Sequence, residues 1–303
     1  MTLSFLRLQK TCVLFLLFLG ALTISLNEAI AAPPLVGREQ VNGTLWMQRA
    51  AEYRIAAEQV YRLATERLPS VAASPGSAAL EQMDMPQTTL ATLPTAIVVD
   101  LDETVLDNSF YQARRAIAGA EYDELSWQAW MSEASAPAIP GAVDYLREAS
   151  RAGHRIFYVT NRLCQPSPTL PNDPCPAKRW TQKNLQALGL PNADEESALI
   201  VRGERPEWQS SDKTARRNWI AARYRIVALF GDDLRDFVDR RTYAARESEL
   251  RTLFGSRWFL LPNPMYGSWE RALVDGACVA GMSTADCAAA STARRYAALD
   301  PQP

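Results

Sequence analysis

The feature that most constrains the fold is a short apolar run that ends in two aspartates. Residues 96–99 read Ala-Ile-Val-Val, the composition of a buried β-strand, and Asp100, Asp102 and Thr104 follow at every second position. Carboxylates are costly where a strand leaves the core, so two that face one pocket need a cation or a chemical role. One aspartate can attack phosphorus while the other moves a proton and a metal ion neutralises both. The structural alternative, which this motif alone does not exclude, is a strand followed by a helix-capping Asx turn.

Strands and helices alternate along the rest of the chain. We expect strands at 96–99, 155–159, 198–201, 226–230 and 258–261, and helices near 126–133, 140–152, 177–188 and 213–224. This alternation predicts an α/β fold in which parallel strands are joined by right-handed crossovers. Before the first strand, residues 44–68 have apolar residues at helical spacing, with Pro69 beyond the expected end. Residues 70–94 have little periodicity and are expected to form a loose connection.

Polar side chains gather where the expected strands end. They are Asp100 and Asp102 after the first strand, Thr160, Asn161 and Arg162 after the second, Lys213 before the fourth, and Asp232, Asp233 and Asp236 after it. Ligands of open parallel sheets bind beyond the carboxyl ends of the strands. Phosphoryl transfer needs a nucleophile, an acid/base, a hydroxyl, an ammonium group and an acidic cluster, and these side chains could supply them. The chain has one histidine, His154, so phosphohistidine chemistry and Ser-His-Asp hydrolysis are not expected.

The beginning of the chain has the pattern of a cleaved secretory signal. Arg7 and Lys10 precede an uncharged apolar run over residues 11–26, and small residues at Ala29 and Ala31 suit a signal peptidase. The alternative is an uncleaved membrane anchor, although the run is short for a span of about 20 residues. No cysteine stands at the expected cleavage point. We therefore expect a periplasmic or secreted protein without a stable membrane anchor after cleavage.

The cysteines fit an oxidising compartment. Of five cysteines, Cys12 lies in the expected signal, and the other four form two local pairs. We predict the disulfides Cys164–Cys175 and Cys278–Cys287. Neither pair has Cys-x-x-Cys spacing, so a zinc site is not expected. The formal net charge is −2 and no basic run occurs, which argues against duplex nucleic acid as a partner.

Five segments together resemble the class C (subfamily IIIB) acid phosphatases of the haloacid-dehalogenase-like (HAD) superfamily, which are bacterial exported 5′-nucleotide phosphatases. The segments are residues 100–109, 157–162, 211–213, 231–237 and 262–270. The resemblance implies a HAD-like Rossmannoid parallel sheet flanked by helices. A small helical subdomain would come from the N-terminal segment and from the insertion after the first motif. The expected order is a signal peptide (1–31), an N-terminal helical segment and linker (32–95), the phosphatase core (96–271) and a disulfide-bearing tail (272–303).

The resemblance also implies a mechanism with named roles. Asp100 would attack phosphorus and form a phosphoaspartate, and Asp102 would act as acid and then as base. Mg²⁺ would bind Asp100, the backbone carbonyl of Asp102 and Asp232, because a hard cation prefers oxygen ligands. Thr160 and Lys213 would hold the phosphoryl oxygens. Asp233 or Asp236 would orient metal-bound water.

The expected substrate is a small phosphomonoester, with nucleoside 5′-monophosphates favoured. In the class C phosphatases, aromatic side chains at the positions of Trp127 and Tyr266 look like a clamp for a nucleoside base, and Asn161 is a further candidate for substrate binding. Two alternatives stay open. The protein could be a phosphomonoesterase or phosphotransferase without nucleotide preference, or a non-catalytic exported binding protein. The intact Asp100 and its neighbouring carboxylates favour an enzyme.

Overall fold

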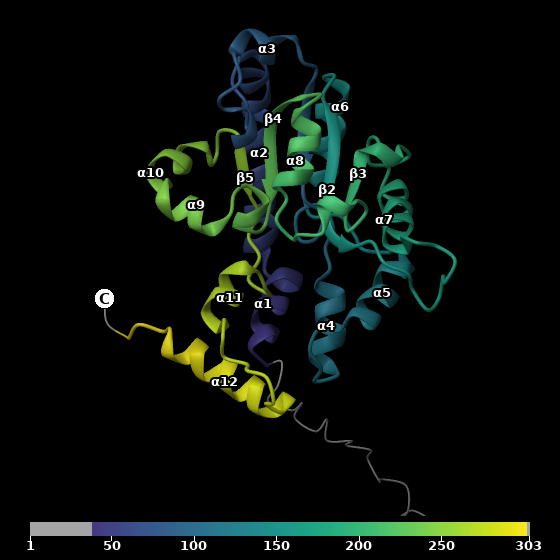
Figure 1. Ribbon diagram of the computed structural model, residues 1–303, viewed down its shortest axis with the longest axis vertical. Coiled ribbons are helices and arrows are strands. Elements are labelled where there is room, and N and C mark those ends of the chain that lie inside the picture. Colours follow the sequence, from purple (N-terminus) through teal and green to yellow (C-terminus); the bar gives the residue numbers. More distant parts are fainter. Residues whose placement is uncertain (1–37, 302–303) are drawn as a thin grey trace, which may run out of the picture. The chain divides into compact units, whose positions relative to one another are not determined.

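A computed structural model describes residues 38–301, and the expected signal peptide lies outside them. The centre of the protein is a five-stranded sheet in the order β3-β2-β1-β4-β5, with every neighbouring pair parallel (Figure 1). The strands are β1 (Thr95–Val99), β2 (Arg155–Leu163), β3 (Leu199–Arg202), β4 (Arg225–Gly231) and β5 (Trp258–Leu260). The prediction of an α/β fold with these five strands is confirmed.

The central strand β1 is buried on both faces, which explains its unbroken apolar sequence. Ile97 and Val99 pack into one core cluster, and Ala96 and Val98 pack into another on the opposite face. Successive side chains of a strand point to opposite faces, so the two clusters are separated by the sheet. β1 therefore delivers Asp100 from the middle of the sheet to its carboxyl edge.

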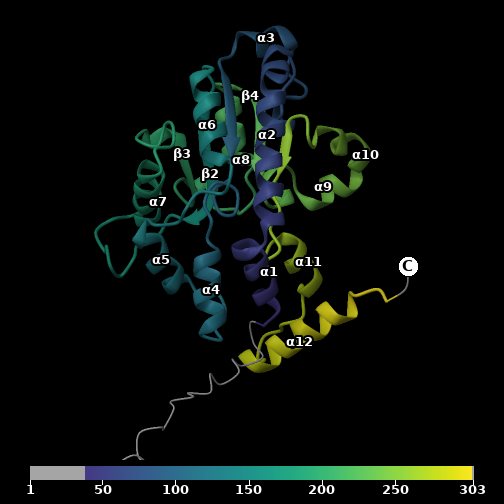
Figure 2. The same ribbon diagram turned by 180° about the vertical axis from the view of Figure 1, so that it is seen from behind.

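Helices cover both faces of the sheet (Figures 1 and 2). The core cluster that contains Ile97 and Val99 includes buried residues of α2 (Ala51–Ala73), α6 (Ala142–Arg151) and α7 (Pro176–Ala187). The opposite cluster includes residues of α8 (Thr214–Ala221) and the short helix η3 (Pro206–Trp208). On the first face Tyr61 of α2 stacks on Phe230 of β4, with ring centroids 5.6 Å apart.

The N-terminal segment differs from the expected single helix over 44–68. It forms α1 (Arg38–Arg49) and α2, with extended backbone at Ala50 between them. Pro69 lies inside α2 and does not end it. A proline inside a helix removes a backbone hydrogen bond, but Leu68 and Val71 on either side of it are buried against the core, and this packing holds the last turns of the helix together.

The prediction of a loose connection over 70–94 was wrong. This segment contains η1 (Leu80–Gln82) and α3 (Gln87–Thr92). The fully buried amide of Gln82 donates to the carbonyls of Ala221 and Tyr224, at 2.9 and 2.8 Å, and accepts from the backbone of Ile226. These contacts join residues about 140 positions apart, so no local periodicity could reveal them.

A helical region stands beyond the carboxyl edge of the sheet (Figure 1). It contains α1, α4 (Ser109–Ile117) and α5 (Glu124–Glu133), and α1 packs against α4. The expected helix at 126–133 is α5, whereas α4 was not predicted. This region matches the expected helical subdomain made of the N-terminal segment and the insertion after the first motif.

The remaining elements lie mostly in the C-terminal part. They are η2 (Glu196–Ala198), η4 (Leu234–Asp236), α9 (Arg240–Ala245), α10 (Glu247–Leu250), η5 (Arg251–Leu253), α11 (Ser268–Val274) and α12 (Thr284–Ala297). Both predicted disulfides, Cys164–Cys175 and Cys278–Cys287, are present. Within residues 38–301 no helix combines the length and the apolar character that a membrane crossing requires.

Candidate active site

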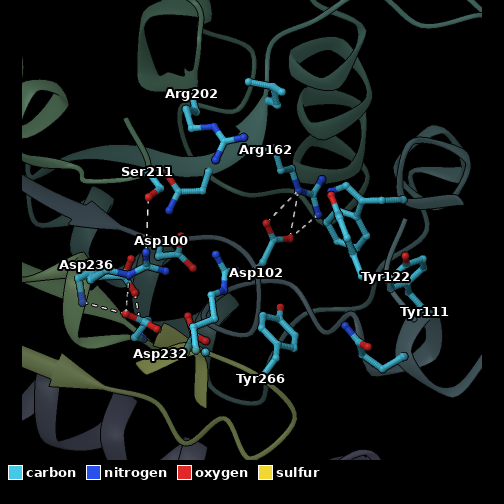
Figure 3. Close-up of a pocket in the computed structure, with 18 of the residues that line it drawn as sticks. Asp100, Asp102, Tyr111, Tyr122, Arg162, Arg202, Ser211, Asp232, Asp236 and Tyr266 are labelled. Atoms are coloured by element: carbon cyan, nitrogen blue, oxygen red, sulfur yellow. Dashed lines mark hydrogen bonds and ion pairs between the residues drawn. The ribbon is translucent and has the colours of Figure 1, made fainter. Parts of the chain in front are cut away.

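The carboxyl ends of β1, β2 and β4 meet at a cavity of about 590 Å³ (Figure 3). Its walls include most of the predicted site residues: Asp100, Asp102, Trp127, Asn161, Asp232, Asp233, Asp236 and Tyr266. Asp100 and Asp102 come from the end of β1, Asn161 from β2, and the other three aspartates from the turn after β4. The cavity therefore lies where the topology of an open parallel sheet predicts a ligand site.

Asp100 is buried and paired with a buried lysine. Its Oδ1 forms an ion pair with Nζ of Lys213, and its Oδ2 accepts a hydrogen bond of 3.1 Å from the Thr104 hydroxyl. Lys213 is 2% exposed and also pairs with Asp236 at 2.7 Å. Burial raises the pKa of Asp100 to about 7, although the Lys213 ammonium opposes this change. For Lys213, burial lowers the pKa, but Asp100 and Asp236 together hold it above its usual value.

Asp100, Asp232 and Asp236 form a compact acidic cluster. One oxygen from each lies within 4.8 Å of the other two. Burial raises the pKa of Asp232 well above its usual value, and the charges of Asp236 and Asp100 add to this rise. Asn263 donates a hydrogen bond of 2.7 Å to Asp232, which orients its carboxylate. Three converging carboxylates fit a hard divalent cation such as Mg²⁺, because such ions take oxygen ligands and neutralise the mutual repulsion.

The side chain of Asp102 points to a different set of partners. Arg162 donates to Oδ1 of Asp102 from Nη2 at 2.8 Å and from Nε at 3.0 Å. Asn108 donates to the same oxygen at 2.9 Å, and the Thr160 hydroxyl lies 3.3 Å from the other oxygen. Arg162 is itself 3% exposed and donates to Thr181 at 3.0 Å. Asp102 is thus fixed at the cavity wall, outside the acidic cluster.

An irregularity at the end of β2 makes this arrangement possible. Thr160 pairs with Val201 of β3, but the register shifts before Leu163 pairs with Arg202. Asn161 and Arg162 lie in this bulge, and both line the cavity. A bulge re-aims side chains beside a site. The fully buried Arg216 supports it, donating to the Thr160 carbonyl at 2.6 Å and to the Asn161 side chain at 2.7 Å.

The two aspartates that were expected to orient water lie in different environments. Asp236 joins the acidic cluster and contacts Lys213. Asp233 caps η4 and accepts a hydrogen bond of 2.6 Å from the Ser268 hydroxyl. Burial raises the pKa of Asp233, but hydrogen bonds from Ser268 and the Arg235 backbone outweigh it and hold the pKa below its usual value. Asp233 therefore ties the turn after β4 to the loop that carries Tyr266.

An aromatic wall borders the cavity on the side of α4 and α5. Trp127 packs edge-on against Tyr111, with ring centroids 5.0 Å apart, and Tyr122 lies next to both. The Arg162 guanidinium lies 5.5 Å from the Trp127 ring centre. Figure 3 shows Tyr111 and Tyr122 together on one side of the cavity and Tyr266 between them and Asp232. Trp127 and Tyr266 thus border one cavity, as an aromatic clamp would require.

Residues 25–269 match the model of the HAD superfamily, subfamily IIIB (Acid phosphatase). The chain belongs to this family. It is 26% identical to Acid phosphatase 1 of Solanum lycopersicum over 172 residues, which make up 56% of the chain and 57% of that relative. The chain therefore matches little more than half the length of this curated relative.

Solved structures agree with the membership in subfamily IIIB. The class C acid phosphatase from Bacillus anthracis is 29% identical and has a TM-score of 0.69, with 88% of this chain and 99% of that chain covered. A second structure of that phosphatase, with tungstate bound, has the same identity and TM-score and covers 89% of this chain and 99% of that chain. The resemblance to the class C acid phosphatases is confirmed.

Several residues of this subfamily IIIB site were not found from the sequence. Arg216 and Asn108 support the bulge and Asp102, and Tyr111 and Tyr122 complete the aromatic wall. Asn108 lies inside the first recognised segment, and Arg216 follows the third by three residues. A search for polar residues beside the motifs could have found these two. Tyr111 and Tyr122 are not polar residues beside a recognised segment, so such a search would not have found them.

Proposed function

We propose that the protein is a phosphoric monoester hydrolase, a Mg²⁺-dependent acid phosphatase that works through a phosphoaspartate on Asp100. The observation that carries this proposal is the buried ion pair of Asp100 and Lys213 beside the carboxylates of Asp232 and Asp236. Membership in subfamily IIIB and the tungstate complex of the Bacillus anthracis relative support it. The cation would be held by Asp100 and Asp232, with Asp236 beside them. When bound, it would supply positive charge to the phosphoryl oxygens.

The first half of the reaction transfers the phosphoryl group to the enzyme. A carboxylate oxygen of Asp100 forms a bond to phosphorus as the bond between phosphorus and the leaving oxygen breaks. The proton of Asp102 passes to the leaving oxygen, so an alcohol departs. Lys213 and the Thr160 hydroxyl stabilise the charge on the transferred group. Asp102 must hold a proton at this stage, which favours acidic pH. The positive charge of the cation would keep Asp100 ionised under these conditions.

The second half returns the enzyme to its starting state. Asp102, now a carboxylate, takes a proton from water as the water oxygen attacks phosphorus. The bond between phosphorus and Asp100 breaks, and inorganic phosphate leaves. The contacts of Asp102 with Arg162 and Asn108 suit this double role, because they hold its carboxylate in one orientation while leaving Oδ2 with fewer partners.

The substrate class we propose is the nucleoside 5′-monophosphates. Trp127 and Tyr266 border the same cavity as Asp100, and Tyr111 packs edge-on against Trp127. Aromatic stacking accepts any base, since every base has a π-face. A phosphatase without nucleotide preference remains the competing function, and equal rates with a nucleotide and a small aliphatic phosphate would favour it.

We also propose that the protein is exported after removal of residues 1–31. The two disulfides of the described part support this, since disulfides persist in oxidising compartments. The mass of the N-terminal peptide of the protein purified from its native cells tests the proposal. A mature N-terminus near residue 32 is expected, and an intact Met1 in the cell interior would contradict it.

Phosphate release from p-nitrophenyl phosphate and adenosine 5′-monophosphate tests the activity. The assay compares Mg²⁺ with EDTA at pH 5 and 7. We expect turnover that needs Mg²⁺ and that Asp100→Asn abolishes. The exposed Asp84 provides a matched control, since Asp84→Asn makes the same chemical change away from the cavity. Full activity of Asp100→Asn would exclude the proposed nucleophile.

A further inference from the structure

Arg202, the last residue of β3, lines the cavity with a cation that no carboxylate among residues 38–301 neutralises. Its Nε is buried and has no hydrogen-bond partner, and no ion pair among residues 38–301 includes its guanidinium. The side chain is only partly exposed. An unpaired cation that is partly withdrawn from water is costly, so it indicates an anion that arrives with the ligand.

The other basic side chains around the cavity have partners or lie in solvent. Lys213 pairs with Asp100 and Asp236, and Arg162 pairs with Asp102. Arg235 lies 3.3 Å from Asp233. Arg271 is exposed to water, which screens its charge. Among the described residues of this cavity, Arg202 is therefore the partly buried basic side chain that forms no ion pair with a carboxylate.

The position of Arg202 places it away from the reacting phosphoryl group. It pairs in register with Leu163, beyond the bulge that starts after Thr160. Figure 3 shows it on the same side of the cavity as Arg162 and on the opposite side from Asp232 and Tyr266. Arg202 therefore lies across the cavity from Asp232 of the acidic cluster.

The charge of Arg202 acts on two other side chains, Tyr122 of the aromatic wall and Arg216. Burial, and then a hydrogen bond of 2.7 Å to Glu124, raise the pKa of Tyr122, whereas the charge of Arg202 lowers it. Arg202 also adds to the effect of burial in lowering the pKa of Arg216 to about 10. Glu124 forms no ion pair with Arg202 within the described chain, and its carboxylate accepts hydrogen bonds from Tyr122 and Gln128.

We propose that Arg202 is a specificity determinant that binds a second phosphate on the leaving group of the substrate. This inference rests on the proposed phosphatase function and narrows its substrate class to nucleoside bisphosphates. A guanidinium binds two phosphate oxygens through parallel hydrogen bonds, which a lysine cannot reproduce. With the reacting phosphate at Asp100 and a base against the aromatic wall, the second phosphate of a nucleoside 3′,5′-bisphosphate would reach Arg202.

The test compares adenosine 3′,5′-bisphosphate with adenosine 5′-monophosphate by initial rates of phosphate release. We expect a higher kcat/KM for the bisphosphate with the wild-type enzyme. Arg202→Gln should lower the ratio of the two kcat/KM values by about tenfold or more, the loss expected for hydrogen bonds to a charged group. Arg202→Lys should give an intermediate ratio. The exposed Arg62 lies on α2 outside the cavity, so Arg62→Gln should leave the ratio unchanged.

Two results would overturn the proposal. One is a wild-type enzyme that does not prefer the bisphosphate, a comparison that needs no variant to fold. The other is an unchanged ratio in Arg202→Gln. If the wild type hydrolyses none of its substrates, p-nitrophenyl phosphate included, the phosphatase function fails. Calorimetric binding of the bisphosphate to wild type and Arg202→Gln then decides the subsite, with equal affinities contradicting it.

Discussion

The guanidinium Nη2 of Arg162 lies 2.8 Å from a carboxylate oxygen of Asp102. Both side chains come from strand ends, but 60 residues separate them in the sequence. The pair fixes the orientation of the proposed acid/base at the cavity wall while the acidic cluster stays free for a cation. The two carboxylates of this motif thus have different neighbours, and we propose that they have different tasks.

Removal of Arg162 should impair catalysis. We expect Arg162→Met to lower kcat about 100-fold, because a catalytic group that moves by about 1 Å can lose this factor. Steady-state rates with p-nitrophenyl phosphate measure the effect, and Arg162→Lys should recover part of it. A kcat within twofold of wild type in Arg162→Met would show that the pair does not position Asp102.

The acidic cluster depends on a glycine. A Cβ at Gly231 would lie 2.3 Å from the Asp236 side chain, so Gly231→Ala must displace this carboxylate. We expect weaker Mg²⁺ activation, measured as a higher Mg²⁺ concentration at half-maximal rate. The control is Gly153→Ala, which meets no atom within 4 Å and adds only backbone strain of about 1–2 kcal/mol at its positive φ. Equal Mg²⁺ dependence in Gly231→Ala and wild type would contradict the role of Asp236.

The aromatic wall should contribute to nucleotide recognition and not to chemistry. Trp127→Ala should lower kcat/KM for adenosine 5′-monophosphate by a factor that corresponds to the loss of one stacked base, about 1–3 kcal/mol. The kcat/KM for glycerol 3-phosphate should change little. Trp127→Phe should retain most of the preference. Trp219, which packs near Trp208 outside this cavity, provides the control Trp219→Phe. Parallel losses on both substrates in Trp127→Ala would indicate a structural role instead.

His154 should make the protein less stable in mild acid. Its Nδ1 lies 2.7 Å from the Thr95 hydroxyl, and burial, with the nearby charge of Arg225, lowers its pKa. Below about pH 6.5, His154 binds a proton more readily in the unfolded chain than in the folded protein. The free energy of unfolding therefore falls as the pH decreases below this value. Urea unfolding at pH 5 and 7.5 measures this slope, and His154→Gln should reduce it. An NMR titration of this single histidine with a pKa above 6.5 would contradict the assignment.

The parts of the fold that were predictable are those with local causes. The strand at 96–99 is apolar because both its faces are buried, and its aspartates follow directly in the sequence. The contact of Arg162 with Asp102 depends on a bulge in β2, which leaves no trace in the spacing of the sequence. It also depends on Arg216, whose place beside a motif can be read from the sequence but whose contact with the bulge cannot. Pro69 misled the placement of a helix end because tertiary packing outweighed its local preference.

The residues proposed to carry out the chemistry were easier to predict than the residues that form the walls of the cavity. Aspartate, lysine and threonine at strand ends are recognisable because parallel strands deliver their ends to one edge. Tyr111 and Tyr122 reach the cavity through the helix α4 and the turn after it, and α4 was not predicted. The unpaired state of Arg202 can be seen only once all its possible partners have been placed.

The proposed mechanism requires Asp100 to carry the phosphoryl group during turnover. Acid quenching during turnover of p-nitrophenyl phosphate, followed by borohydride reduction, converts a phosphoaspartate into homoserine, which peptide mass spectrometry locates. We expect homoserine at residue 100 in the wild type and none in Asp100→Asn. An actively turning over enzyme with unmodified Asp100, or with homoserine at another aspartate, would contradict it.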